Sequence, residues 1–418
     1  MKNLVIKNAI VVDPKNSIEE KKDVYVENGV FVETMPKGEV DVIDAEGLHI
    51  FPGFVEIHCH LREPGQSYKE TVATGTMAAA AGGYTSIIPM PNTNPNIDDA
   101  SSYRLLKYII EDSAKVNVYI SACISEGRKG EKLAPIGTLA KLGAVAITDD
   151  GSCIQSNELM FKALEYASMF DILVMDHCQD ASLTKKAQIN GGLVSIATGL
   201  GAWENAGEDL IVSRNIILSK YTNARVHMQH LSSAYSVELI RNAKQNGIRV
   251  SGEASPHHIS LSDENLLGYD TNFKMNPPLR TQKDIDAIIE GLCDGTIEAI
   301  ATDHAPHSEA DKDVEFDYAP FGIIGFETAF SVCYETLVKS GKMPLMRLVE
   351  LLTSSPASLV GLDAGSMSYG KEADFCLVDL NEKYVYNKTY SLSKNSPWWN
   401  KELQAKVKAT YLKGSKVF

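Results

Sequence analysis

The stretch Phe54-Val-Glu-Ile-His58-Cys-His60-Leu-Arg62-Glu-Pro-Gly65 decides the fold prediction. Its apolar first half predicts a buried strand, and Pro64-Gly65 is expected to end it. Because side chains along a strand alternate between two faces, His58, His60 and Arg62 are expected to point to one side. Two imidazoles at this spacing can bind one divalent metal, although a His-x-His pair also occurs on strands that hold no metal. The rest of the chain decides between these alternatives.

Outward from this stretch, apolar strand-like runs alternate with segments of helical periodicity. This alternation is typical of a (β/α)8 barrel. A doubly wound open sheet would also alternate, but it gives no reason for polar residues after nearly every strand. The predicted strands are residues 54–60, 84–90, 116–123, 144–149, 172–176, 225–229, 248–254 and 298–302, and the clearest helices between them are residues 102–113, 157–169, 233–245 and 283–292.

The two ends of the chain have a different, all-β character. Short alternating segments at residues 4–12, 23–32 and 41–44 are separated by polar turns, and residues 374–379 and 406–412 return to this style. A chain of 418 residues suits one large domain and a smaller one. We therefore predict a small β domain built from residues 1–50 and 365–418, beside a barrel domain of residues 51–364.

The amino-acid composition limits which binding partners and which cellular compartment are expected. A formal net charge of −14 argues against nucleic acid, because phosphate binding needs a basic face, and solubility alone explains it. No apolar stretch is long enough to span a bilayer, and the N-terminal residues lack the apolar region of a secretory signal. Seven scattered cysteines without a Cys-x-x-Cys pair indicate buried thiols in a reducing compartment. We expect a cytoplasmic protein with no membrane partner.

Side chains that can hold a metal follow most of the predicted strands. In a barrel the carboxyl ends of all strands ring one mouth, so residues distant in sequence are expected to converge there. Imidazole and carboxylate ligands suit Zn²⁺, whose bound water can attack an amide or ester carbon, and Asp303 could carry the proton to the leaving nitrogen. Each residue alone has a plainer role, such as a core histidine or a helix cap. The six candidates are His58, His60, one acid of the pair Asp149-Asp150, His177, His230 and Asp303.

Several longer motifs resemble the dihydroorotases of the amidohydrolase superfamily, and the resemblance runs from about residue 2 to the end of the chain. It implies a metal-containing (β/α)8 barrel with a small β-sandwich built from both termini. It also implies the reversible cyclisation of N-carbamoyl-L-aspartate to L-dihydroorotate in pyrimidine synthesis. The motifs are His58-Cys-His60-Leu-Arg62-Glu-Pro-Gly, Pro91-Asn92-Thr93-Asn94-Pro95, Lys274-Met-Asn276-Pro-Pro-Leu-Arg280, Thr302-Asp303-His-Ala-Pro-His307 and Ala319-Pro-Phe-Gly-Ile-Ile-Gly-Phe-Glu-Thr328.

The resemblance assigns a role to each matching position. One Zn²⁺ would be held by His58, His60 and Asp303 and a second by His177 and His230, with Asp150 bridging the two. Asp303 would be the catalytic base and acid. The implied substrate-binding residues are Arg62, Asn92 and His307 at the substrate's carboxylate, Asn276, Phe321 and Gly322 along the amide edge of its ring, and His60.

Three positions depart from the family pattern. Glu56 stands where the family usually has Asp, and Trp203 lies in a loop where relatives often have a Pro-x-x-Ala-Glu run. Many superfamily members bridge their metals with a carboxylated lysine, but no lysine lies closer to Asp150 than Lys141. The chain therefore resembles the subgroup with a bridging aspartate. That subgroup includes members with a single metal, which leaves one or two Zn²⁺ per subunit open.

Two alternatives to a dihydroorotase share part of this pattern. A dihydropyrimidinase or allantoinase typically uses the carboxylated lysine, and dihydropyrimidinase substrates lack the carboxylate that Arg62 would hold. A non-catalytic subunit that scaffolds a transcarbamoylase is an alternative from another class, but such subunits have lost metal ligands that this chain keeps. A homodimer and an association with aspartate transcarbamoylase stay open as partners.

Overall fold

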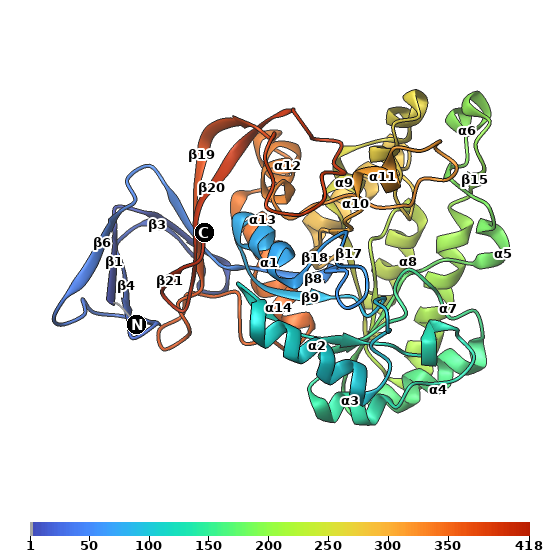
Figure 1. Ribbon diagram of the computed structural model, residues 1–418, viewed down its shortest axis with the longest axis horizontal. Helices are drawn as coiled ribbons and strands as arrows, with labels where there is room; N and C mark the ends of the chain where they lie inside the picture. The colour runs from blue at the N-terminus through green and yellow to red at the C-terminus, as the bar shows by residue number, and fades with distance from the viewer. Residues whose placement is uncertain (1–2) are drawn as a thin grey trace.

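The computed structural model describes residues 3–418, and the described chain forms a barrel ringed by helices with a smaller β structure at its side (Figure 1). Residues 1 and 2 of the predicted β domain lie outside the described residues. The fold is a (β/α)8 barrel with a β-sandwich built from both termini, which confirms the predicted fold class.

The barrel strands follow one another in parallel around the ring. A parallel bridge between Cys59 and His304 closes the ring between the first and last strands. The predicted strand 116–123 is split into two short strands, so nine labelled strands fill the eight positions. They are β8 (Phe54–Cys59), β9 (Tyr84–Pro89), β10 (Asn117–Val118), β11 (Ser121–Ala122), β12 (Ala146–Ile147), β13 (Leu173–Asp176), β16 (Val226–Met228), β17 (Val250–Ala254) and β18 (Ala299–Ile300).

Four of the helices match the predicted ones to within two residues at each end: α2 (Ala100–Ser113), α4 (Asn157–Ser168), α8 (Ala234–Gln245) and α10 (Gln282–Asp294). The local sequence helps these helices to begin. At the start of α2, for example, the Asp99 side chain accepts hydrogen bonds from backbone N–H groups of the first turn. No helix within residues 3–418 is long and apolar enough to cross a membrane. The other α-helices are α1 (Val72–Ala81), α3 (Ile136–Leu142), α5 (Ala181–Thr184), α6 (Leu193–Thr198), α7 (Ala206–Thr222), α9 (Pro256–Ser260), α11 (Glu309–Lys312), α12 (Ala329–Cys333), α13 (Leu345–Leu352) and α14 (Ser354–Leu359).

Short elements fill the connections between these helices and strands. A π-helical turn, η5 (Tyr334–Lys339), continues α12 without a break. A two-stranded pair lies in the loop that carries Trp203. The remaining elements are η1 (Pro14–Asn16), η2 (Glu126–Arg128), β14 (Ile189–Asn190), β15 (Ala202–Trp203), η3 (Asp263–Gly268) and η4 (Thr271–Phe273).

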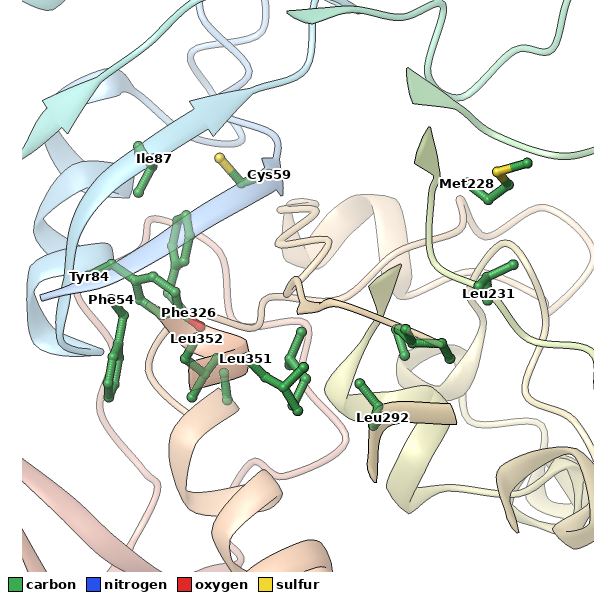
Figure 2. Close-up of a cluster of buried hydrophobic side chains, with 14 of the residues drawn as sticks. Phe54, Cys59, Tyr84, Ile87, Met228, Leu231, Leu292, Phe326, Leu351 and Leu352 are labelled. Atoms are coloured by element: carbon green, nitrogen blue, oxygen red, sulfur yellow. The ribbon is translucent and has the colours of Figure 1, made fainter. Parts of the chain in front are cut away.

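An apolar core anchors the first two barrel strands against the helices that follow the barrel. The rings of Phe54 and Tyr84 lie 5.6 Å apart, edge to face, and Phe54 also stacks on Phe330 at 5.4 Å. Figure 2 shows this group continuing to Leu351 and Leu352 of α13. Each barrel strand is buried on both faces, because helices cover its outer face and the other strands enclose its inner face. Its side chains are therefore apolar on both sides. This burial fixes the strand whose end carries His58.

The β domain consists of two sheets that enclose their own apolar core. Its C-terminal strand β19 pairs with the N-terminal strand β7, which joins the two ends of the chain. The predicted segments 4–12 and 23–32 each contain two strands, separated by turns at Asn8 and at Asn28–Gly29 that have positive φ. The strands are β1 (Asn3–Lys7), β2 (Ile10–Asp13), β3 (Ile18–Lys21), β4 (Val24–Glu27), β5 (Val30–Val32), β6 (Val40–Asp44), β7 (His49–Pro52), β19 (Phe375–Val385), β20 (Glu402–Leu412) and β21 (Ser415–Lys416).

Residues 386–401, which connect β19 to β20, leave the sandwich and lie against the barrel; we call them the C-terminal excursion. The Ser393 hydroxyl donates to the carbonyl oxygen of Lys69 at 2.7 Å. The Asn395 amide donates to the carbonyl oxygen of Ala305 at 3.0 Å. The predicted domain boundaries stay a prediction, and β7 extends two residues beyond the first of them. The excursion therefore brings the C-terminal part of the chain to the loops that follow the barrel strands.

Candidate metal centre and substrate cavity

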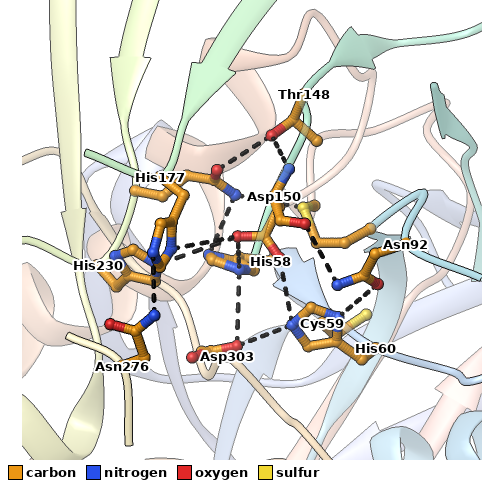
Figure 3. A network of polar contacts seen from close by, with 12 residues as sticks. His58, Cys59, His60, Asn92, Thr148, Asp150, His177, His230, Asn276 and Asp303 are labelled. Carbon is orange, nitrogen blue, oxygen red and sulfur yellow. Dashed lines mark hydrogen bonds and ion pairs between the residues drawn. The ribbon is translucent and has the colours of Figure 1, made fainter. Parts of the chain in front are cut away.

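The barrel brings the six predicted metal ligands together at the carboxyl ends of its strands (Figure 3). His58 lies at the end of β8, and His177 directly follows β13. Apolar strand residues deliver each ligand to the mouth, where all six side chains are buried. In Figure 3 the side chains of His58, His60, His177, His230 and Asp303 surround that of Asp150.

Asp150 is the residue that the ligand groups share. Its Oδ1 lies 3.2 Å from Nε2 of His58, and its Oδ2 lies 3.5 Å from Nε2 of His60. On the other side, its Oδ1 lies 3.8 Å from Nδ1 of His177 and 4.0 Å from Nε2 of His230. Two groups, His58–His60–Asp150 and Asp150–His177–His230, could each hold a metal ion, and a bridging carboxylate would belong to both.

Asp303 adds a second carboxylate on the side of His58 and His60. Its Oδ1 lies 3.0 Å from Nε2 of His60 and 3.6 Å from Nε2 of His58. Its backbone has a φ of 47°, an uncommon conformation for a residue other than glycine. A carboxylate at this place can bind a metal through one oxygen and exchange a proton through the other.

The donor set fits a divalent metal. Nε2 of His58 is buried and makes no hydrogen bond with any described residue, although a carboxylate oxygen lies close by. In each of the two groups the donor atoms lie within 4.8 Å of one another, as the ligands of one ion require. Burial lowers the pKa of His230 well below its usual value. A neutral imidazole is the form that binds metals, and imidazole and carboxylate donors together could hold a metal ion here.

Two side chains orient the histidines from outside the cluster, and the sequence analysis did not identify either. Oε1 of Glu253 lies 2.5 Å from Nδ1 of His58, and Oε2 lies 3.0 Å from Nε2 of His227. The amide oxygen of Gln179 lies 2.8 Å from Nε2 of His177. Such contacts hold each ring so that its other nitrogen faces the metal. Glu253 could not be found from the sequence because it lies within the buried strand β17, where no local motif marks it.

A cavity of about 290 Å³ opens beside the cluster. Every residue predicted to bind substrate lines it, and so do four of the predicted metal ligands other than His60. The seven substrate-binding candidates are His60, Arg62, Asn92, Asn276, His307, Phe321 and Gly322. Residues separated by more than 200 positions in the chain therefore share one wall.

One wall of the cavity is suited to an anion. Nη2 of Arg62 lies 3.3 Å from Nε2 of His307, and the Arg62 Nε–H donates to the carbonyl oxygen of Pro306 at 3.1 Å. Burial lowers the pKa of Arg62 to about 10, so its guanidinium group is still charged at neutral pH. Asn92 reaches the metal side, because its Oδ1 lies 3.0 Å from Nδ1 of His60. A carboxylate is the ligand that such a forked cation binds best.

Other residues that line the cavity offer amide and backbone groups. The Oδ1 atom of Asn276 is buried without a hydrogen-bond partner among the described residues, so it is free to accept an N–H group of a ligand. Gly322 has a φ of 123°, and a Cβ there would come within 2.6 Å of the Cβ of Ala305. Only glycine therefore lets this backbone approach the cavity.

The departures from the family pattern have local explanations. Glu56 accepts a hydrogen bond from the backbone N–H of His58 at 2.7 Å and one from that of Thr302 at 2.8 Å. It thus joins the first and last barrel strands, and burial raises its pKa to about 8. Trp203 is buried with the Arg280 guanidinium 5.5 Å above its ring. Lys141 is exposed at the end of α3, so it does not stand in for a bridging lysine.

The fold is similar to that of solved hydantoinases. L-hydantoinase (dihydropyrimidinase) from Arthrobacter aurescens matches with a TM-score of 0.88 and 23% identity, over 100% of this chain and 96% of that one. Dihydropyrimidinase from Brevibacillus agri matches with a TM-score of 0.85 and 22% identity, over 99% of this chain and 94% of that one. The protein thus has the fold of these solved hydantoinases, a barrel with a β-sandwich beside it.

Sequence similarity defines the family within that class. Residues 47–236 match the family described as dihydro-orotase-like. Dihydroorotase from Acetivibrio thermocellus is 46% identical over 99% of this chain and 98% of that protein, and dihydroorotase from Elusimicrobium minutum is 44% identical over 98% and 96%. The chain belongs to the dihydroorotase family, as its motifs predicted.

Proposed function

We propose that the protein is a dihydroorotase, a cyclic amide hydrolase that interconverts N-carbamoyl-L-aspartate and L-dihydroorotate in de novo pyrimidine (UMP) synthesis. The family membership supports this function. The proposal rests chiefly on one observation. Asp150 and the histidines around it line the same cavity as the Arg62–His307 pair. A cyclic amide that carries a carboxylate would place its scissile bond beside the Asp150 cluster and its carboxylate beside the Arg62–His307 pair.

The proposed cofactor is Zn²⁺, one or two ions per subunit. His58, His60 and Asp303 would hold one ion and His177 and His230 the other, with Asp150 as the bridge. A bound metal would supply Lewis-acid activation of a water molecule and of the amide carbonyl. Nitrogen and oxygen donors without a thiolate support Zn²⁺ as the ion.

The proposed catalytic residue is Asp303. In hydrolysis its carboxylate takes a proton from the attacking water and then gives it to the ring nitrogen as the amide bond breaks. In cyclisation the same group runs these steps in reverse. Its position, 3.0 Å from Nε2 of His60 and on the cavity wall, supports this role.

The other cavity residues hold the substrate. Arg62, Asn92 and His307 would bind the carboxylate that does not react, since they provide N–H donors on one wall. The free Oδ1 of Asn276 would accept a ring N–H, and the backbone of Phe321 and Gly322 would pair with the rest of the amide edge. His60 would lie next to the bound ring.

A dihydropyrimidinase or allantoinase is the alternative enzyme. The similarity to solved hydantoinases concerns the fold alone at 22–23% identity. An uncharged dihydropyrimidine ring would leave the buried Arg62 without an anion, which costs binding energy. A non-catalytic scaffold would not need six buried ligands in contact, so this alternative has the least support.

A substrate comparison tests the function. The purified, zinc-loaded protein should convert L-dihydroorotate and N-carbamoyl-L-aspartate into one another, with kcat/KM for L-dihydroorotate far above the values for dihydrouracil and allantoin. A higher kcat/KM for dihydrouracil would favour the alternative enzyme, and a loaded protein without activity on any of these compounds would favour the scaffold.

We also propose a cytoplasmic location, which the seven free thiols support. The homodimer and the association with aspartate transcarbamoylase stay predictions. Light scattering of the protein alone, and of its mixture with aspartate transcarbamoylase, tests both.

A further inference from the structure

The contacts of His307 determine which of its ring nitrogens carries the proton. Its Nε2 lies 2.8 Å from the carbonyl oxygen of Phe321, and a carbonyl can only accept a hydrogen bond. Its Nδ1 lies 3.3 Å from Nζ of Lys69, and an ammonium group can only donate. The proton therefore belongs on Nε2, and the lone pair of Nδ1 faces Lys69.

The His307 ring has only this one N–H proton, so the imidazole is uncharged. Burial of His307 and the positive charges of Arg62, Lys69 and Lys312 lower its pKa well below the usual value, and the hydrogen bond to the Phe321 carbonyl opposes them only in part. The imidazole is thus neutral at neutral pH. In a neutral ring the partner of one nitrogen decides the state of the other.

Lys69 is held in place by contacts outside the cavity. Its side chain is 12% exposed, and its Nζ lies 3.6 Å from Oδ2 of Asp311. Two residues of the C-terminal excursion bind the backbones of Lys69 and His307 and so hold the two residues next to each other. Ser393 donates to the Lys69 carbonyl oxygen at 2.7 Å, and Asn395 accepts a hydrogen bond from the His307 backbone N–H at 3.1 Å.

The Nε2–H group of His307 is one of two donors that lie together on the cavity wall. Nη2 of Arg62 lies 3.3 Å from it, and both residues line the cavity. The Nε2 proton already bonds the Phe321 carbonyl oxygen, so an anionic oxygen that accepts from Arg62 would share this proton with the carbonyl in a three-centre hydrogen bond. If His307 carried its proton on Nδ1 instead, Nε2 would be an acceptor and would repel the same oxygen.

We propose that Lys69 is a positioning residue, whose ammonium group holds His307 as the Nε2–H tautomer, so that a substrate carboxylate bound by Arg62 meets the Nε2 proton, shared with the Phe321 carbonyl oxygen, rather than a lone pair. The identity of that carboxylate rests on the proposed function, whereas the tautomer does not. Lys69 lies outside the sequence motifs and touches neither the metal ligands nor, in this role, the substrate.

The first test measures the tautomer directly in the metal-loaded protein without substrate. Ring-¹⁵N-labelled histidine reports by NMR whether each nitrogen carries a proton, and His307→Gln identifies the His307 signals. The parent protein should show a protonated Nε2 and an unprotonated Nδ1. Lys69→Met removes the donor and should shift the ring towards the other tautomer or the doubly protonated form, whereas Lys69→Arg should keep the parent pattern. A parent ring with its proton on Nδ1 would overturn the proposal, and so would an unchanged pattern in Lys69→Met.

The second test is the separation of binding from turnover. Lys69→Met should raise KM for L-dihydroorotate about tenfold, the size expected for a hydrogen bond to a charged group, with little change in kcat. Lys69→Arg should retain most of the parent KM, and Lys371→Met, which removes an exposed lysine paired with Asp363, is the matched control. Equal losses in Lys69→Met and Lys69→Arg would indicate packing alone and overturn the proposal. A parent protein inactive on L-dihydroorotate would refute the proposed function, while the NMR result would still decide the role of Lys69.

Discussion

Nδ1 of His58 and Oε1 of Glu253 lie 2.5 Å apart, although 195 positions separate the two residues in the chain. Both side chains are fully buried. The contact leaves Nε2 of His58 to face Asp150 and the metal site, as in other carboxylate–histidine–metal arrangements. Glu253 therefore sets the orientation of a proposed metal ligand from outside the ligand cluster.

Glu253→Gln should weaken metal binding about 10–100-fold, because the amide is a poorer acceptor for the His58 ring. Metal content after dialysis against graded chelator concentrations measures this. Glu298→Gln is the matched control, since Glu298 precedes β18 and bonds Lys244 rather than a metal ligand. Equal metal retention in the parent and Glu253→Gln would show that the contact does not matter for binding.

Asp303→Asn should lower turnover at least about 100-fold in both directions, because the amide cannot accept the proton. Substrate affinity should fall less, since the Arg62–His307 pair is untouched. Steady-state rates on both substrates, with metal content measured on the same samples, provide the check. Asp313→Asn, at an exposed position in the loop after α11, is the control. Near-parent turnover with full metal content would rule out Asp303 as the proton carrier.

His177→Ala should remove metal from the site formed with His230 and lower activity. The remaining ligands around His58 and His60 should still bind an ion, so a protein with two metals per subunit should keep one. Elemental analysis of the loaded variant measures the ratio. His49→Ala changes a histidine of the sandwich strand β7 and should leave the ratio unchanged. An unaltered metal content in His177→Ala would contradict the second site.

Arg62→Lys should raise KM for L-dihydroorotate about tenfold or more, because the lysine keeps the charge but loses the fork. kcat should change less than KM. Any slow reaction with dihydrouracil should be unaffected, since that ring has no carboxylate. Arg104→Lys on the exposed side of α2 is the control. If Arg62→Lys weakened the reactions of L-dihydroorotate and dihydrouracil equally, Arg62 would not be the residue that binds the substrate carboxylate.

Lys312 links stability to pH through the loop beside the cavity. Its Nζ donates to the carbonyl oxygens of Pro320 at 2.9 Å and Gly322 at 3.0 Å, and burial lowers its pKa to about 7. Between this value and the ordinary lysine pKa of about 10.4, the unfolded chain binds a proton that the folded protein does not. The contribution of Lys312 to stability should therefore rise with pH in this window.

The prediction is that the free energy of unfolding of the parent relative to Lys312→Met increases by about 2 kcal/mol from roughly pH 7 to roughly pH 9. Urea unfolding of both proteins at each pH measures it, with exposed Lys185→Met as the control. A difference that is constant or falls with pH would show that Lys312 is charged in the folded protein throughout this range.

The sequence by itself predicted the barrel, the β domain from both termini and the residues that line the cavity. It could do so because strand and helix periodicities are local, and because His58, Asp150 and Asp303 lie just beyond apolar runs that the barrel rule brings to one mouth. The chain's motifs also placed His307 and Gly322 on the cavity, where the structure has them. Their roles in catalysis and binding remain predictions.

Only the tertiary structure decided how these side chains are held. Glu253 lies inside a buried strand and Lys69 in a loop, and no local pattern connects either one with the histidine it contacts. Likewise, residues 386–401 were predicted to belong to the sandwich, but the structure places part of them against the barrel loops at Ala305 and Lys69. A periodicity tells which face of an element is buried. Which partner a ring nitrogen meets depends on packing between segments far apart in the chain, so it is settled only when the whole chain has folded.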